Sequence, residues 1–188
     1  MLAITVIAIV IAGGFFMFRR AQAPQAAPRA DMTDDTIKQG WRKLGFFCEL
    51  DEQKKVWTLT GSRAGLLYFP DLLLGYVNDP KHAANGEHEH YGPYGSLEVM
   101  TWQDAGFDGH AIRGTLGHLT HLAELIEAKL ATAQPGEPIR IREEYAAGSP
   151  YSLLLDVRAD GFDPATADRE SLGAIQVDAP PKPVKPAK

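Results

Sequence analysis

Histidine and glutamate alternate in one glycine-rich stretch of the sequence, and both side chains can bind a metal ion. Residues 81–95 read KHAANGEHEHYGPYG, which places His82, His88 and His90 in one loop, with Glu87 and Glu89 interleaved. In an extended chain His88 and His90 would share one face, because side chains repeat every two residues. Imidazole and carboxylate groups are ligands of zinc and similar ions. Zinc bound in the loop 82–90 is therefore one hypothesis. The alternative is a polar surface loop, because the spacing matches no closed structural zinc site.

The usual sequence signatures of enzymes do not occur in this chain. It has no Gly-rich phosphate loop, dinucleotide fingerprint, HExxH or GxSxG motif. The single cysteine, Cys48, lies in an apolar predicted strand, where a thiol is expected to pack as a small hydrophobic group. One cysteine also excludes an internal disulfide and a zinc site built on several cysteines. The sequence thus offers no catalytic residue, and it favours a protein that binds without a cofactor.

Three further histidines lie later in the chain. His118 and His121 are three residues apart in a predicted helix and away from its apolar stripe, so we expect both to face solvent. His110 borders a predicted strand. A site that combines His110 with the loop 82–90 stays open, because the sequence alone does not show their proximity.

Aromatic and acidic side chains gather between residues 86 and 108, in turns that are rich in glycine and proline. Functional residues concentrate on such loops, and tyrosine and tryptophan are enriched among interface residues that dominate binding energy. We predict a contact surface here, with three aromatic anchors and an acidic rim, namely Tyr91, Tyr94 and Trp102 with Glu87, Glu89 and Asp104. The alternative is that these rings pack over a sheet edge and belong to the core.

Charge is distributed unevenly along the 188 residues, whose formal net charge is −5. Residues 33–170 contain 13 basic and 22 acidic residues, whereas the two flanks contain 6 basic and 2 acidic residues. An acidic domain disfavours nucleic acid, whose phosphates are bound by lysine and arginine, and it favours association with a basic protein. The basic flanks suit the anionic inner face of a membrane.

The N-terminus contains an apolar run that predicts a membrane anchor. Residues 2–18 carry no charge and are followed by Arg19 and Arg20, and about 17 apolar residues are the minimum for a transmembrane helix. No basic residue precedes the run, so the positive-inside rule places the C-terminal side in the cytoplasm. A cleaved signal peptide, with a small-residue site at 21–23, is the alternative. It is disfavoured because the charges lie on the wrong flank.

The remaining sequence predicts one α+β domain. We expect an anchor at 1–20, an Ala/Pro-rich linker at 21–32, a globular domain at 33–170 and a Pro/Lys-rich disordered tail at 171–188. A helix capped by Thr33 should end near Gly45, and a longer one should occupy 116–133 with a stripe of apolar residues every three or four positions. Segment 66–77 fits either a strand or a short helix. Hairpin arms are expected at 46–50 with 56–60 and at 139–145 with 151–157, and further strands at 96–101 and 110–115.

Short turns between strands favour a mainly antiparallel sheet packed with one or two helices. Together these patterns predict a membrane-tethered, non-enzymatic interaction module, a regulator or an inhibitor (immunity-type) protein for a basic partner. It would be a single-pass protein of the inner (cytoplasmic) membrane with its domain in the cytoplasm. The alternative function is a metal-binding protein or metal-dependent enzyme that uses the loop 82–90.

Overall fold

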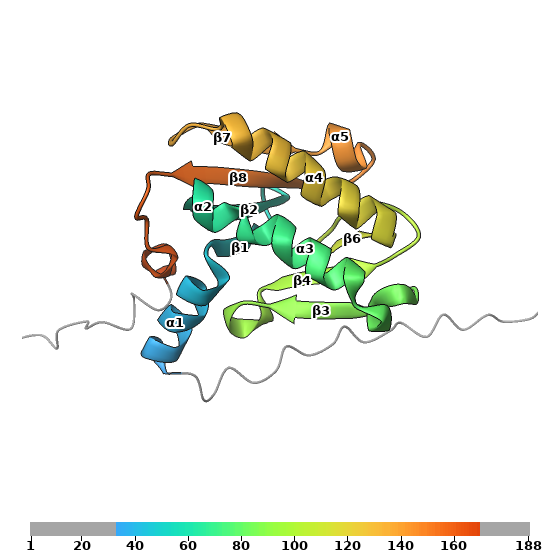
Figure 1. Cartoon of the computed structure of the whole chain (residues 1–188), viewed down its shortest axis with the longest axis horizontal. Coiled ribbons are helices and arrows are strands. Elements are labelled where there is room, and N and C mark those ends of the chain that lie inside the picture. Colours follow the sequence, from blue (N-terminus) through green and yellow to red (C-terminus); the bar gives the residue numbers. More distant parts are fainter. Residues whose placement is uncertain (1–32, 170–188) are drawn as a thin grey trace, which may run out of the picture.

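Two four-stranded sheets, each with parallel and antiparallel neighbours, organise the part of the chain that the structure describes. The computed structural model describes residues 33–169 (Figure 1). The α+β class is confirmed. The expected single, mainly antiparallel sheet is replaced by two mixed sheets, because strands that are not consecutive in the chain pair in parallel at the centre of each sheet.

The first sheet has the strand order β1-β2-β8-β7. Its central strands β2 and β8 run parallel, and each outer strand is antiparallel to its neighbour. The β1–β2 pair confirms the first predicted hairpin. The β7–β8 pair confirms the antiparallel pairing of the last one, but the predicted arm at 139–145 ends at Ile141, because residues 143–146 form a short helix in the connection. The strands are β1 (Phe47–Asp51), β2 (Val56–Ser62), β7 (Pro138–Ile141) and β8 (Ser152–Arg158).

The second sheet has the order β3-β4-β6-β5 and is built from shorter strands. Its central pair, β4 and β6, is parallel, whereas β3 and β5 are antiparallel edge strands. Strands at 96–101 and 110–115 were expected around a single turn. They exist, but the intervening segment forms β5 and so brings β6 alongside β4 in the same direction. The strands are β3 (His88–Tyr91), β4 (Leu97–Thr101), β5 (Gly106–Phe107) and β6 (Ile112–Gly114).

Five α-helices accompany the sheets within the described residues. Helices α3 and α4 contact each other and lie in front of the sheets in Figure 1. Segment 66–77, whose type the sequence left open, is helical, and Pro70 is accommodated in the first turn of α3, where its missing N–H costs no hydrogen bond. The helices are α1 (Asp34–Leu44), α2 (Arg63–Leu66), α3 (Tyr68–Asn78), α4 (Leu116–Thr132) and α5 (Glu143–Ala146), with 3-10 turns η2 (Pro80–Ala83), η3 (Pro93–Gly95) and η4 (Pro164–Thr166).

Helix α1 begins and ends where its capping residues predict. The Thr33 side chain accepts a hydrogen bond from the backbone N–H of Thr36, and Asp34 and Asp35 occupy the positively polarised first turn. Gly45 ends the helix in the left-handed region with φ 88° and donates its N–H to Trp41 O. The prediction for this helix is confirmed at both ends.

Helix α4 presents the predicted apolar stripe to the core. Leu119, Ala123, Ile126 and Leu130 are buried, as expected, while Leu116 is half-buried at the first turn. The helix is capped by Thr115, whose hydroxyl accepts from the His118 backbone while His118 Nδ1 accepts from the Thr115 N–H. The stripe joins both sheets and α1, α2 and α3 in one continuous core.

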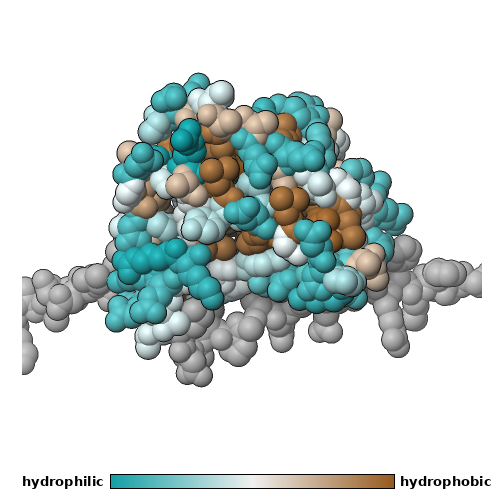
Figure 2. Space-filling view, viewed as in Figure 1, coloured by the Kyte–Doolittle hydropathy of each residue, from teal (hydrophilic) through white to brown (hydrophobic). Residues whose placement is uncertain are grey.

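The face that carries α3 and α4 keeps apolar side chains at its surface. Figure 2 shows hydrophobic groups over these helices, surrounded by hydrophilic ones. The larger exposed ones, Leu67 and Tyr68, lie where α2 meets α3. The partly buried ones that pack on the core from this face are Leu72, Leu74, Val77, Leu116 and Leu125.

Within residues 33–169, no helix combines the length and the apolar character needed to cross a membrane. The predicted anchor at 2–18, the linker and the tail lie outside the described residues.

Candidate functional site

The predicted contact residues lie on and around the antiparallel ribbon formed by β3 and β4. Its register pairs His88 with Met100, Glu89 with Val99, His90 with Glu98 and Tyr91 with Leu97. Because side chains alternate along each strand, the ribbon has two chemically different faces. The inner face carries Glu89 and Tyr91 beside the buried residues of β4. The outer face carries the residues His88, His90, Glu98 and Met100.

Glu89, predicted as part of an acidic rim, is engaged by other side chains on the inner face. Its Oε2 lies 3.4 Å from Lys81 Nζ and 3.2 Å from His82 Nε2, and it accepts a hydrogen bond from the Tyr91 hydroxyl at 3.2 Å. Burial and the nearby carboxylate raise the pKa of Tyr91 above its ordinary value. Glu89 therefore fastens the edge strand to the η2 turn, and a partner would meet it already paired.

His82 does not belong to the polar loop in which the sequence places it. It is 1% exposed, its ring stacks on Tyr76 with the centroids 3.7 Å apart, and its Nδ1 lies 2.8 Å from Tyr76 O. Its Nε2, near Glu89, makes no well-aligned hydrogen bond. The sequence analysis missed this position because it left open whether the segment that carries Tyr76 is a helix or a strand, and the stacking depends on the helix.

Two of the three predicted anchors pack on the core. Tyr91 and Tyr94 are partly buried against the core cluster, which agrees with the alternative that their rings cover a sheet edge. Tyr94 also has the left-handed backbone conformation at φ 61°, between Gly92 and Gly95, which have positive φ angles as well. Such a conformation in a tyrosine costs of the order of 1 kcal/mol or more and needs support from the surrounding structure.

Trp102 is the predicted anchor that reaches solvent. It follows β4, is 36% exposed and borders an open pocket of about 420 Å³ lined also by Ala83, Asn85 and Leu116. Glu87 lies across the end of the ribbon, where its carbonyl accepts from the N–H of Thr101, the residue before Trp102. Asp104 follows Trp102 by two residues, and all three of these predicted residues are exposed. We call Glu87, Trp102 and Asp104 the Trp102 surface.

The outer face of the ribbon brings His88 and His90 together with a carboxylate that the sequence analysis did not single out. His88, His90 and Glu98 each offer a ligand atom, and these atoms all lie within 4.8 Å of one another. The centroids of the two imidazole rings are 5.4 Å apart, and the ring planes are nearly perpendicular. The expectation that His88 and His90 share a face is confirmed. Glu98 could have been found only from the register of β3 and β4, which the sequence does not specify.

The other histidines lie elsewhere. His118 and His121 are exposed on α4, as expected. His110 follows Gly109, which lies beside Glu52 of the turn between β1 and β2, and it is not among the residues that gather around His88 and His90.

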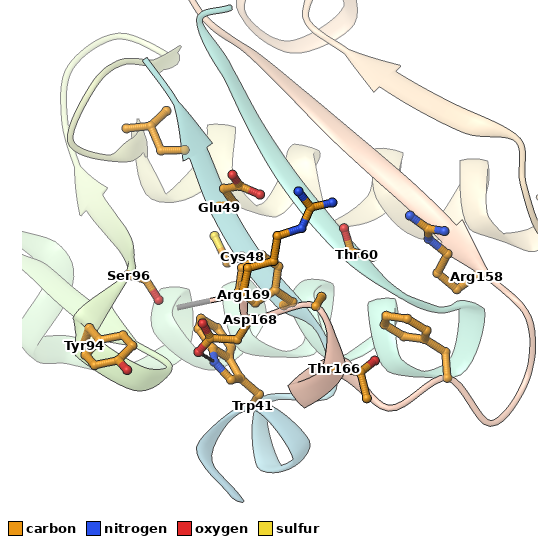
Figure 3. A pocket seen from close by; sticks show the side chains of 14 residues that line it. Trp41, Cys48, Glu49, Thr60, Tyr94, Ser96, Arg158, Thr166, Asp168 and Arg169 are labelled. Atoms are coloured by element: carbon orange, nitrogen blue, oxygen red, sulfur yellow. Dashed lines mark hydrogen bonds between the residues drawn. The ribbon is translucent and has the colours of Figure 1, made fainter. Parts of the chain in front are cut away.

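A larger pocket, of about 690 Å³, opens between β1 and the C-terminal end of the described chain (Figure 3). Trp41 from α1 lies in it, and its indole N–H donates to the buried Asp168 carboxylate at 2.8 Å. Glu49 comes from β1, and Arg158 of β8 and Arg169 of the C-terminal segment add positive charge to the lining. Of the predicted contact residues, only Tyr94 reaches this pocket, and the sequence analysis gave no signal for it.

The polar groups of this larger pocket include hydroxyls, carboxylates and guanidinium groups. Its lining contains hydroxyl groups but no histidine that would activate them. Cys48 lines it with a buried thiol whose pKa is raised by desolvation and by Glu49, which keeps the sulfur protonated and unreactive. The packed thiol agrees with the sequence interpretation of Cys48.

Comparison of the chain with protein-family models, with curated proteins and with solved structures finds no significant match.

Proposed function

We propose that this protein is a membrane-tethered, non-enzymatic interaction module, a regulator or inhibitor of the immunity type, whose cytoplasmic domain binds a basic protein. The observation that carries the proposal is the Trp102 surface. Residues 79–107 contain five carboxylates and one lysine, and Trp102 is exposed among them. An exposed tryptophan beside an open pocket, with acidic neighbours, fits a hydrophobic anchor within a charged rim.

The charges around this surface support a basic partner. Complementary potentials accelerate association and suppress wrong partners, and their effect is screened by salt. Lys81 is already paired with Asp79 and Glu89. Glu87 and Asp104 form no side-chain ion pair with any residue in the described range, so both carboxylates are open to a cationic side chain.

The tether gives such a module its mode of action. Anchoring through residues 2–18 would confine the domain to the membrane surface and so raise its effective concentration toward a partner at the same surface. The basic residues that flank the domain would add attraction to anionic lipids, about 1 kcal/mol for each lysine or arginine near the surface.

Reporter fusions test the orientation. A reporter fused after Met32 should be active only in its cytoplasmic form, because Arg19, Arg20 and Arg29 all follow the apolar run. Activity of a reporter that works only outside the cytoplasm would overturn the proposed compartment and, with it, the cytoplasmic partner.

Site-specific photo-crosslinking in the native cell tests the Trp102 surface. A photoreactive phenylalanine analogue at position 102 of the full-length chain should capture a basic protein, and the same group at the exposed His121 on α4 should not. Equal capture at both positions, or capture of no basic protein at 102, would contradict the proposal.

With the captured partner, purified variants separate binding from folding. Trp102→Ala should weaken binding at least about 30-fold, the equivalent of about 2 kcal/mol for a dominant anchor, with little change in melting temperature. Tyr94→Ala should lower the melting temperature instead, because its ring packs on the core. Glu87→Gln should mainly slow association and reduce its salt dependence. Unchanged affinity in Trp102→Ala would remove this surface from the interface.

A further inference from the structure

We propose that the outer face of the β3–β4 ribbon is a binding site for a divalent transition-metal ion of the zinc type, with His88, His90 and Glu98 as ligands. The inference does not rest on the protein partner proposed above, because the site lies on the ribbon itself and needs no other molecule to exist.

Strand geometry alone brings the three ligands together. His88 and His90 are two residues apart on β3, so both point to the outer face, and Glu98 is the direct cross-strand neighbour of His90 on β4. Their ligand atoms lie within 4.8 Å of one another. Ligands around a tetrahedral zinc ion, at about 2.0–2.1 Å from the metal, are closer together than this. Small rotations of the side chains about an unchanged backbone would therefore complete the site.

Backbone carbonyl groups orient both imidazole rings for this role. His88 Nδ1 lies 3.2 Å from Gly86 O, and His90 Nδ1 lies 3.3 Å from Gly95 O. A carbonyl oxygen only accepts, so each Nδ1 is the donor, and in the neutral ring the lone pair is then on Nε2. Metal-bound histidines are usually held in this way, with the second ring nitrogen donating to a carbonyl or carboxylate.

The glycine-rich turn after β3 supports the second of these contacts. Gly92, Tyr94 and Gly95 all have positive φ, and the turn they form presents the Gly95 carbonyl to His90. A Cβ on Gly95 would lie 3.3 Å from the His90 side chain, so this glycine also allows the close approach. Left-handed backbone at a non-glycine residue is often found where a site needs a fixed geometry.

The negative charge of the Glu98 carboxylate is not balanced by a lysine or arginine within residues 33–169, so it can be balanced by a bound cation. Its side chain is only 13% exposed, and within residues 33–169 the one basic group recorded beside it is His90, whose Nε2 lies 3.8 Å from Glu98 Oε2. A partly buried carboxylate without a lysine or arginine is stabilised by a bound cation. The imidazoles of His88 and His90 are exposed, so water or a group from a bound molecule can occupy the remaining coordination position. Two histidines and one glutamate with an open position are typical of accessible zinc sites.

The test is calorimetric titration of Zn²⁺ into the metal-free full-length chain in detergent solution, followed by Co²⁺ as a spectroscopic probe. We expect one Zn²⁺ per chain, and visible absorption by bound Co²⁺ that reports a low coordination number. His88→Ala, His90→Ala and Glu98→Gln should each weaken Zn²⁺ binding by at least about 100-fold, since even outer-shell partners are worth about 10–100-fold. Affinity should also fall on acidification, because protons compete for the imidazoles.

Two variants serve as matched controls. Met100→Leu changes the same outer face without removing a ligand, and His110→Ala removes an exposed histidine that lies elsewhere. Both should bind Zn²⁺ as the parent does, and circular dichroism should show that every variant is folded. Binding that survives all three ligand substitutions, or that is lost equally in His110→Ala, would overturn the site, as would a parent chain that binds no Zn²⁺ at micromolar concentration.

Discussion

Replacing Ile126 by aspartate should unfold the domain. Ile126 is fully buried in the middle of α4, where its side chain belongs to the core that joins the helices to both sheets. Loss of a buried isoleucine costs about 2–5 kcal/mol, and an unpaired buried carboxylate adds to this cost. The expected loss of about 5 kcal/mol or more approaches the whole stability of an ordinary domain. Thermal unfolding followed by circular dichroism measures the effect.

The matched control for this change is His121→Asp, on the exposed side of the same helix. It introduces the same carboxylate in the N-terminal half of α4, where negative charge is tolerated, so its melting temperature should stay within a few degrees of the parent. A melting temperature of Ile126→Asp equal to that of the parent would show that Ile126 does not lie on the side of α4 that faces the core.

Substitution of Gly65 by alanine should be nearly as damaging, although it adds only a methyl group. A Cβ at this position would overlap the backbone carbonyl of Gly45, the residue that ends α1. Both sides of the contact are backbone, so no flexible side chain can move away. Overpacking in a filled interior usually costs about 1–3 kcal/mol, and we expect the upper end of this range or more. Urea denaturation at an unchanged m-value would measure it.

Gly75→Ala provides the opposite result in a neighbouring helix. Gly75 is exposed on α3, and apart from its chain neighbours and the backbone of its own helix no atom lies within 4 Å of the position of its added Cβ. Alanine should therefore stabilise the domain by about 0.5–1 kcal/mol, because it reduces the freedom of the unfolded chain and favours the helix. A similar midpoint for both glycine variants would show that the approach of α2 to α1 is looser than described.

Local signals in the sequence predicted the local structure well. The cap at Thr33, the glycine stop at Gly45 and the apolar spacing of α4 depend on residues within a few positions of one another, and all three are confirmed. The first hairpin of the first sheet depends on a short turn and is confirmed as well, whereas β7 and β8 pair across a longer connection that contains α5. These features follow from hydrogen bonding and side-chain periodicity within a single segment.

The features that the sequence missed depend on contacts between distant segments. No local pattern predicts that β2 pairs with β8, or that β4 is parallel to β6, because such pairing depends on the packing of the whole domain. For the same reason Glu98 was not recognised as a neighbour of His90, and His82 was placed on the surface. Among the predicted anchors, Trp102 is exposed, whereas Tyr91 and Tyr94 are partly buried. This difference arises from tertiary packing, so the sequence does not predict it.

The position of β8 has a consequence for how the protein is made. It is the last strand in the described chain, yet it lies between β2 and β7, and residues 63–151 separate it from its parallel partner. Pairing across such a long segment is slow, because the chain must close a large loop before the contact forms. Until residue 158 has left the ribosome, β2 has an open edge and β7 has no neighbour. The nascent chain therefore carries an unfinished, aggregation-prone sheet through most of its synthesis, and a truncation before β8 should leave a product that chaperones and proteases remove.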